Sequence, residues 1–347
     1  LTQSYANIVG SKKSEVVAMN TLTVNLHLMM VSFYKPTSKR HKIVIEADAF
    51  PSDVYAVESQ IKFHGFDVAT SLIKIRPRLG ESVLRTEDIT EVINREGDEI
   101  SLIMLGGVNY YTGQVFEFEK IVKSAHSKSI FVGFDLAHAV GNIKLKLHDW
   151  NIDFAVWCSY KYLNSGPGSV GGAFIHERHH DSDLPRFSGW WGHNKGDRFD
   201  MPQTFNPIKT VEGWQLSNPP ILSLAAIRAS LSLFEEVGME KLVAKSKGLT
   251  EYLLYLLNTI DSDRIEIITP LNSGCQISIR VKNGNKDLFE KSFSSPLKEA
   301  RKHFEKEYLT TQLKKNHGNI SKTADFIGME RSALHRKLKE LGIKGIN

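Results

Sequence analysis

The sequence has 347 residues, with 44 Lys and Arg against 39 Asp and Glu, a formal net charge of +5. Hydrophobic residues make up 41% and charged residues 24%, which is typical of a globular protein and excludes a disordered chain, a collagen-like repeat and a disulfide scaffold. The length predicts two or three domains. No apolar run reaches the roughly 18 residues that a membrane helix needs, so we expect no membrane segment.

The two cysteines, Cys158 and Cys275, lie far apart, each in an apolar stretch. This spacing favours two buried, reduced thiols in a cytoplasmic protein rather than a disulfide. We predict no metal site. The sequence starts at Leu1 without Met or a signal peptide, so we expect a fragment that lacks its own N-terminus.

Short β-rich runs alternate with amphipathic helical patterns in the first half of the chain. The expected strands are Lys42–Glu46, Leu72–Arg76, Ile100–Leu105, Ile130–Asp135, Asp153–Cys158 and Gly171–His176. The helices expected between them include Pro51–His64, Thr86–Arg95 and Phe116–Ala125. This alternation predicts an α/β fold with a mostly parallel sheet, in which ligands bind at the carboxyl ends of the strands.

A smaller α/β domain is expected after Asn218-Pro219-Pro220. Its expected helices and strands are Ile221–Val237, Glu240–Ile260, Arg264–Thr269 and Gln276–Val281. We therefore predict a large domain at residues 1–218, followed by an incomplete small domain at residues 219–291.

The last part of the chain differs in charge. From Pro296 to Asn347 there are twelve Lys or Arg and six Asp or Glu, a net charge of +6, whereas the remainder carries −1. A short polar stretch that ends in Pro, residues 292–296, predicts a linker. Residues 297–347 then form a separate module with a different partner.

Two residues with chemical potential each follow a predicted strand. Lys161, between two tyrosines, is placed to form a Schiff base, although a surface lysine has the same pattern. Asp135 could pair with a protonated pyridine nitrogen or serve as a helix N-cap. Strand–Asp followed by strand–Lys, 26 positions apart, favours a pyridoxal-phosphate enzyme.

From about Tyr5 to about Lys291 the sequence resembles the kynureninase family, whose members are pyridoxal-phosphate enzymes of the aspartate aminotransferase fold. The matching segments, in order and at matching spacing, are Met19–His27, Glu46–Asp53, Tyr111–Gln114, Gly133–Asn142, His148–Trp150, Trp157–Asn164, Gly189–His193 and Ser217–Pro220. The resemblance implies a mostly parallel sheet of the aminotransferase type and pyridoxal 5'-phosphate as cofactor.

The same resemblance implies the residues of the site. Lys161 would hold the cofactor and shuttle protons, Asp135 would pair with its ring nitrogen, and Tyr160 would reach its phosphate and relay a proton. Those three would be catalytic. The cofactor-binding residues implied are Leu22, Thr23, Phe50, Asp53, Asp135, His138, Tyr160, Lys161, Trp190 and Asn218.

Several of these residues have specific expected positions. Leu22 and Thr23, at a helix start, would face the phosphate, and Phe50 would stack on the ring. Trp190 and Asn218 would come from a partner subunit, which implies a homodimer. Core packing is the alternative for Phe50, and packing within the Trp-Trp pair is the alternative for Trp190.

The reaction that the resemblance implies is hydrolysis of L-kynurenine to anthranilate and L-alanine, or of 3-hydroxykynurenine to 3-hydroxyanthranilate and L-alanine. It belongs to tryptophan catabolism and NAD biosynthesis. The sequence departs from the family at three places. The N-terminal pocket segment is absent before Leu1, Gly106 stands where the family has Ser, and the resemblance stops before the arginine that would bind the substrate carboxylate. Nothing in the spacing makes Arg280 a substitute for that arginine.

The tail predicts three helices: Leu297–Asn316, Lys322–Ile327 with Ser321 as its N-cap, and a basic helix that begins near Ser332. A helix, a short turn with Gly328 and a basic helix is the helix-turn-helix pattern. The segment is similar to the Fis-type DNA-binding domain of nitrogen-regulator-type transcription factors. The residues that would contact duplex DNA are Lys322, Arg331, Ser332, His335, Arg336 and Lys337. A solvated basic helix is the alternative.

Three hypotheses follow for the whole chain. The first is a kynureninase-like hydrolase that carries a DNA-binding module. The second is a catalytically impaired regulator, whose pyridoxal-phosphate domain senses a ligand while the tail binds DNA as a dimer. The third is an artefactual junction of two genes. Because most of the chain matches one enzyme family, we take the hydrolase as the leading hypothesis.

Overall fold

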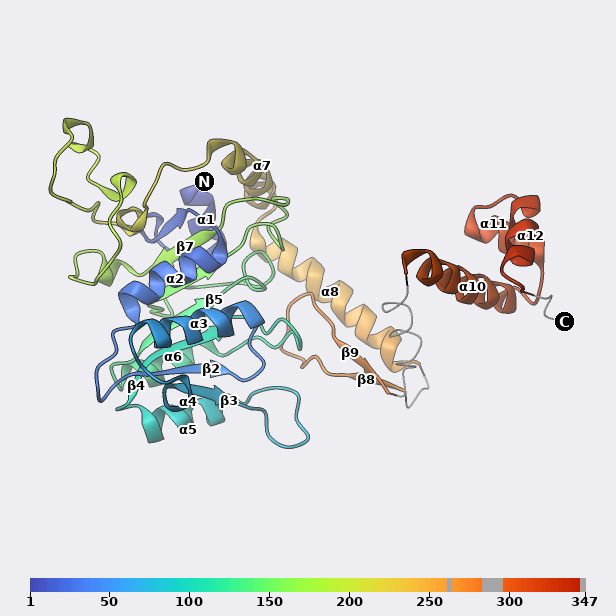
Figure 1. Ribbon diagram of the computed structural model, residues 1–347, viewed down its shortest axis with the longest axis horizontal. Helices are drawn as coiled ribbons and strands as arrows, with labels where there is room; N and C mark the ends of the chain where they lie inside the picture. The colour runs from blue at the N-terminus through green and yellow to red at the C-terminus, as the bar shows by residue number, and fades with distance from the viewer. Residues whose placement is uncertain (261–263, 283–295, 344–347) are drawn as a thin grey trace. The chain divides into compact units, whose positions relative to one another are not determined.

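The computed structural model describes residues 1–260, 264–282 and 296–343 (Figure 1). The chain forms two compact units, one of Leu1–Asp261 and Ile267–Arg280, the other of Ser262–Glu266 and Val281–Asn347. Within the described residues, no helix combines the length and apolar character that crossing a membrane requires.

The first unit is built on a seven-stranded sheet. Its strands are β1 (Val16–Ala18), β2 (Lys42–Glu46), β3 (Leu72–Ile75), β4 (Ile100–Gly106), β5 (Phe131–Asp135), β6 (Phe154–Trp157) and β7 (Gly172–Ile175). The strand order is β1-β7-β6-β5-β4-β2-β3. The pairs from β3 to β6 are parallel, and only β6–β7 and β7–β1 are antiparallel. The mostly parallel α/β sheet predicted from the sequence is confirmed.

Helices connect and cover these strands. They are α1 (Thr2–Val9), α2 (Leu22–Phe33), α3 (Pro51–Phe63), α4 (Val68–Ser71), α5 (Thr86–Glu96), α6 (Phe118–His126), α7 (Ile221–Val237) and α8 (Met239–Asn258). Short 3-10 turns are η1 (Lys13–Glu15), η2 (Glu177–His179), η3 (Trp190–Gly192), η4 (Arg198–Asp200) and η5 (Val211–Trp214). The strands β8 (Ile265–Ile267) and β9 (Ile279–Val281) form a second, two-stranded sheet.

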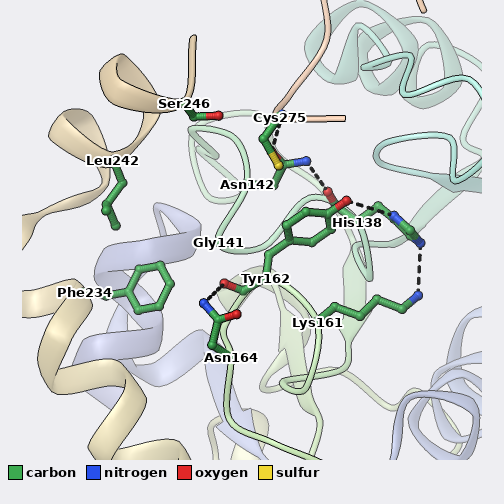
Figure 2. A pocket seen from close by; sticks show the side chains of 10 residues that line it. All are labelled: His138, Gly141, Asn142, Lys161, Tyr162, Asn164, Phe234, Leu242, Ser246 and Cys275. Atoms are coloured by element: carbon green, nitrogen blue, oxygen red, sulfur yellow. Dashed lines mark hydrogen bonds between the residues drawn. The ribbon is translucent and has the colours of Figure 1, made fainter. Parts of the chain in front are cut away.

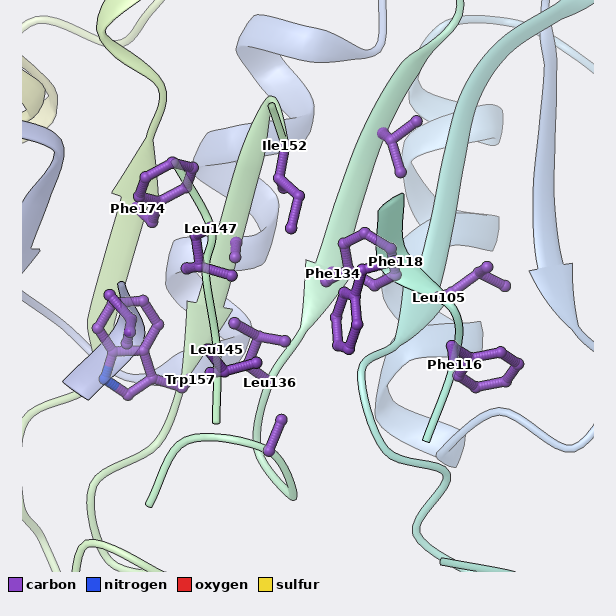
Figure 3. Close-up of a cluster of buried hydrophobic side chains, with 14 of the residues drawn as sticks. Leu105, Phe116, Phe118, Phe134, Leu136, Leu145, Leu147, Ile152, Trp157 and Phe174 are labelled. Carbon is purple, nitrogen blue, oxygen red and sulfur yellow. The ribbon is translucent and has the colours of Figure 1, made fainter. Parts of the chain in front are cut away.

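Alternate side chains of the parallel strands enter two different apolar clusters. Ile43 and Leu102 pack in the cluster that includes residues of α2 and α3. Val44, Leu105 and Phe134 belong to the opposite cluster, which includes residues of α1, α5, α6 and α7 and is drawn in part in Figure 3. Because successive side chains of a strand point to opposite faces, a strand that is apolar at every position requires helices on both faces.

A buried carboxylate ties several elements together at the start of β6. Asp153 accepts hydrogen bonds from the backbone N–H of Val132 at 2.8 Å and from Arg178 at 2.6 Å, and it pairs with the rings of His126 and His179 at 2.9 and 2.8 Å. Burial alone would raise the pKa of Asp153, but these partners hold it well below its usual range.

The second unit contains three helices, α10 (Leu297–Lys315), α11 (Ile320–Ile327) and α12 (Arg331–Glu340). They surround a small apolar core of Leu309, Leu313, Ala324, Leu334, Leu338 and Leu341. Gly328 joins α11 to α12 with a positive φ of 68°, which glycine adopts without steric cost. The three expected helices are present.

Two sequence expectations are wrong. Cys275 is exposed, whereas Cys158 is buried, because Cys275 lies in the loop between β8 and β9. The N-cap of α11 is Asn319, not Ser321: the helix begins at Ile320, and the Asn319 side chain accepts the Lys322 N–H at 3.0 Å. The domain boundaries at residues 218 and 291 stay predictions. Of the expected linker, residues 292–295 lie outside the described residues, as do residues 283–291 of the expected small domain.

Candidate active site

A cavity of about 400 Å³ lies at the carboxyl ends of the parallel strands. Glu46, Gly106 and Asp135 are the last residues of β2, β4 and β5, and all three line it. The other lining residues come from helix starts and from loops beyond the strands; they are Leu22, Phe50, Ser52, Asp53, Val108, Tyr110, Ala137, His138, Tyr160 and Lys161. This edge is where a parallel α/β sheet places its ligands.

Lys161 lies in the loop that follows β6. Its Nζ is 3.1 Å from Nε2 of His138 and 5.5 Å from the centre of the Phe50 ring. Burial, and after it the charge of Lys161, lower the pKa of His138 to about 4. His138 is therefore neutral near pH 7, and its Nε2 can accept a hydrogen bond from the lysine.

Asp135 and Asp53 form an interacting pair of buried carboxyl groups. Asp135 accepts the Ala137 N–H at 2.7 Å, while Oδ1 of Asp53 has no hydrogen-bond partner among the residues that the structure describes. Burial, and then the neighbouring Asp135, raise the pKa of Asp53 to about 9, and burial also raises the pKa of Asp135. A cationic N–H donor placed against this pair would stabilise an ionised carboxylate, because its positive charge would offset the negative charge of that carboxylate.

Glu46 is a third buried carboxyl group at this edge, and sequence reasoning assigned it no role. Its two carboxylate oxygens lie 3.3 and 3.2 Å from the Gly106 nitrogen, which donates to them, and burial raises its pKa to about 7. A Cβ atom on Gly106 would approach Oε1 of Glu46 to 2.9 Å. The glycine that departs from the family's serine therefore leaves space for this carboxyl group. The sequence feature that could have identified Glu46 is its position as an acidic residue at the end of the apolar strand β2.

The start of α2 supplies the groups suited to an anion. Leu22 is the first residue of α2 and lines the cavity, and Thr23 Oγ1 lies 3.1 Å from Oγ of Ser52, which also lines it. The first backbone N–H groups of a helix attract phosphate. Tyr160 is half exposed and lines the same cavity.

Two of the residues predicted to bind the cofactor, Trp190 and Asn218, do not line this cavity within one chain. Trp190, in η3, is 44% exposed and lines a separate cavity, and Asn218 is also exposed. Their contribution from a partner subunit stays a prediction. Arg280 lines a neighbouring cavity of about 160 Å³ that shares Glu46 with the first.

In the second unit, the predicted DNA-contacting residues divide into two groups. Arg331, Ser332, His335 and Arg336 on α12 are exposed, as is Lys322 on α11. The Nζ of Lys337 instead lies 2.8 Å from a carboxylate oxygen of Glu305 on α10. A phosphate contact by Lys337 would therefore compete with an existing ion pair.

Two family models match the chain in succession. The aminotransferase class-V model matches residues 2–294, and the model described as bacterial regulatory protein, Fis family, matches residues 300–341. The two family resemblances stated from the sequence agree with these matches.

Curated relatives of the first part are named kynureninase. The chain is 57% identical over 295 residues to the protein of Koribacter versatilis, covering 84% of this chain and 70% of that protein. It is 54% identical over 292 residues to the protein of Flavobacterium psychrophilum, covering 82% and 69%.

Solved structures share the fold at low identity. A complex of the cystine C-S lyase C-DES with cysteine persulfide matches with a TM-score of 0.70 and 16% identity, over 86% of this chain and 76% of that one. The cysteine desulfurase of Thermococcus onnurineus matches with a TM-score of 0.65 and 17% identity, over 84% and 70%. These likenesses support the fold of the first unit.

Proposed function

Because the chain belongs to the kynureninase family of class-V aminotransferases, a family of pyridoxal-phosphate enzymes that hydrolyse a carbon–carbon bond, we propose that it cleaves L-kynurenine to anthranilate and L-alanine. 3-Hydroxykynurenine would be a second substrate, giving 3-hydroxyanthranilate. The observation that carries the proposal is the arrangement of Lys161, His138 and the Asp53–Asp135 pair around one cavity of suitable size.

The residues of this cavity fit pyridoxal 5'-phosphate. The unpartnered Oδ1 of Asp53 and the buried Asp135 would receive its ring N–H, and the amine of Lys161 would bind its aldehyde carbon. The start of α2 would hold its phosphate. When bound, the cofactor withdraws electrons from the substrate bonds that break.

The protein's own groups then have to move protons. Lys161 takes the proton from the substrate α-carbon, and neutral His138 accepts a hydrogen bond from its Nζ. Water adds to the substrate carbonyl carbon, and the bond from that carbon to the neighbouring CH₂ group breaks. That CH₂ group leaves with the electron pair and takes a proton to become the methyl group of alanine, and Lys161 returns a proton to the α-carbon. Tyr160, which is half exposed and lines the cavity, is proposed to supply or relay the proton that the CH₂ group takes.

The active form is proposed to be a homodimer. Trp190 and Asn218 are exposed in one chain and do not line its cofactor cavity. Large exposed side chains, Phe187, Phe199 and Met201, lie in the same part of the sequence as Trp190. An exposed apolar surface of this kind is typical of a contact with another protein surface.

The experiment that tests this function separates cofactor binding from turnover. The purified chain should give a visible absorption band with pyridoxal phosphate and then produce fluorescent anthranilate from kynurenine. Lys161→Ala should lose the borohydride-fixable cofactor and at least about a hundredfold in rate, because it removes both the attachment and the proton shuttle. Lys123→Ala, an exposed lysine on α6, is the matched control. Fixation retained by Lys161→Ala would contradict the assignment.

A second function is supported by a separate observation. The Fis-type match coincides with a basic helix, α12, on which Arg331, Ser332, His335 and Arg336 are exposed together. We propose that this unit binds duplex DNA, with phosphates and base edges as the contacted groups. The proposed DNA contact does not depend on turnover in the first unit.

A further inference from the structure

A second cavity, of about 610 Å³, also has Lys161 and His138 in its lining (Figure 2). Lys161 and His138 line both cavities, so the two cavities adjoin at these side chains. The other residues of the second cavity are Gly141, Asn142, Tyr162, Asn164, Phe234, Leu242, Ser246 and Cys275. The function proposed above gives this second cavity no role.

A chain of three polar groups crosses from one cavity to the other. Nζ of Lys161 lies 3.1 Å from Nε2 of His138, and Nδ1 of the same imidazole lies 3.4 Å from the hydroxyl of Tyr162. Figure 2 shows the Tyr162 ring within the second cavity, with its hydroxyl directed at His138. The imidazole thus uses both of its nitrogens, one toward Lys161, which lines both cavities, and one toward Tyr162, which lines only the second.

The turn that carries His138 is held by a neighbouring amide. Asn142 donates from Nδ2 to the His138 carbonyl at 2.8 Å, and its Oδ1 accepts the Cys275 N–H at 2.8 Å. These contacts fix the imidazole between Lys161 and Tyr162 without using either ring nitrogen. The arrangement is therefore a positioned one rather than the chance approach of exposed side chains.

Because the pKa of His138 is lowered to about 4, its imidazole relays a proton only by releasing one from Nδ1 as it takes one up at Nε2. When Nζ of Lys161 donates to Nε2, the imidazole proton has to be on Nδ1, where it donates to the Tyr162 oxygen. Burial raises the pKa of Tyr162, so its hydroxyl keeps its own proton, which is free to point into the cavity. The titratable groups nearby include Asp135, Asp53 and Cys158 on the cofactor side, the hydroxyl of Tyr110, and the thiol of Cys275, which lines the second cavity.

We propose that Tyr162 is a relay residue that, acting through His138, exchanges the proton of Lys161 with solvent in the second cavity while substrate covers the first. In an outward transfer, Nζ gives a proton to Nε2, Nδ1 gives its proton to the Tyr162 oxygen, and the hydroxyl proton passes to water. The imidazole is left with its proton on Nε2. An inward transfer reverses each step, so one of each restores the starting state. The proposal rests on the proposed hydrolysis, because it concerns the proton that Lys161 removes from the substrate.

The first test follows a hydrogen isotope. With kynurenine turned over in D₂O, a lysine in contact with solvent loses the proton it took, and the alanine formed carries deuterium at its α-carbon. Tyr162→Phe should retain several-fold more of the original protium at this carbon, with turnover lowered about tenfold. Tyr252→Phe, an exposed tyrosine on α8 that lines neither cavity, is the control and should match the wild type. Equal protium retention in wild type and Tyr162→Phe would overturn the relay.

The second test needs no turnover. In the cofactor-free full chain with labelled histidine, the side-chain nitrogen signals of His138, assigned by their absence in His138→Gln, should show the Nδ1–H tautomer. Tyr162→Phe should shift the Nδ1 proton signal upfield, because its acceptor is lost, while Tyr252→Phe should not. An Nε2–H tautomer in the wild type, or an unchanged signal in Tyr162→Phe, would overturn the proposal. These signals decide the relay whether or not the chain hydrolyses kynurenine, so the two proposals fail separately.

Discussion

Three carboxyl groups, those of Glu46, Asp53 and Asp135, share the edge of the sheet where the cofactor would bind. Each is almost fully buried, and burial raises the pKa of Glu46 to about 7 and that of Asp53 to about 9. Such a cluster is unfavourable for the fold alone, since buried carboxylates repel one another and lose hydration. A cationic ring nitrogen would relieve both costs, which is why the cluster suits the proposed cofactor.

The raised pKa of Asp53 has a consequence for the stability of the cofactor-free chain. The folded state keeps a proton on Asp53 that the unfolded state loses above about pH 4. Stability from this group is therefore present below that pH and is lost as the pH rises toward about 9. Asp53→Asn removes the ionisation, so its melting temperature should fall less between pH 5 and pH 9, approximately the window between these two values.

Melting curves of the two proteins across that pH range measure the effect. Asp48→Asn, at an exposed residue in the turn before α3, is the control and should follow the wild type. Parallel pH dependence for wild type and Asp53→Asn would show that Asp53 does not hold the proton.

The sequence predicted these residues to different extents, for physical reasons. Asp135 and Lys161 could be found because each follows an apolar strand, and the carboxyl ends of parallel strands meet at one edge. Asp53 was found only by resemblance, since nothing in its local helix pattern marks a partner that lies 82 positions away. Glu46 and Tyr162 were given no role. Glu46 is marked by its burial and by the hydrogen bond that Gly106 of β4 donates to it, and Tyr162 is marked by its contact with His138. Both are tertiary contacts, which the local sequence does not show.

At the scale of elements, the spacing of hydrophobic residues predicted the bounds of helices and strands well where tertiary packing agrees with the local sequence pattern. β2 occupies Lys42–Glu46 and α7 occupies Ile221–Val237, both as expected. The N-cap of α11 was wrong because Asn319 and Ser321 are both good capping residues, and local sequence does not choose between them. Starting at Ile320 places Ile320, Ala324 and Ile327 on one face, against the core of the second unit.

This difference predicts the effects of two substitutions two positions apart. Asn319→Ala should destabilise α11 by about 1 kcal/mol, because the Lys322 N–H loses its acceptor. Ser321→Ala should change the stability by less than about 0.5 kcal/mol, since it is an exposed residue inside the helix. Hydrogen exchange of the Lys322 and Thr323 amides in the full chain measures both. Faster exchange in Ser321→Ala than in Asn319→Ala would restore the sequence-based cap.

At the scale of the whole molecule, the chain joins a nearly neutral unit that matches one enzyme family to a basic unit that matches a family of regulatory proteins. The charge difference was visible in the sequence, as was the change of family. The sequence did not show which basic side chains are available to a ligand, because the ion pair between Lys337 on α12 and Glu305 on α10 is a tertiary contact.

That ion pair makes neighbouring residues of α12 a matched pair for testing DNA binding. Arg336 is exposed, so Arg336→Ala should weaken binding to a labelled duplex of mixed sequence and reduce the slope of log affinity against log salt by about 1, the value for one lost phosphate contact. Lys337→Ala should change both quantities less, because Lys337 already pairs with Glu305 at 2.8 Å and contacts a phosphate only by giving up that partner. Fluorescence anisotropy of the full chain over a series of salt concentrations measures both variants. A larger loss in Lys337→Ala would mean that the ion pair opens on DNA, and equal affinity and slope in wild type and Arg336→Ala would contradict the assignment of Arg336 as a DNA contact.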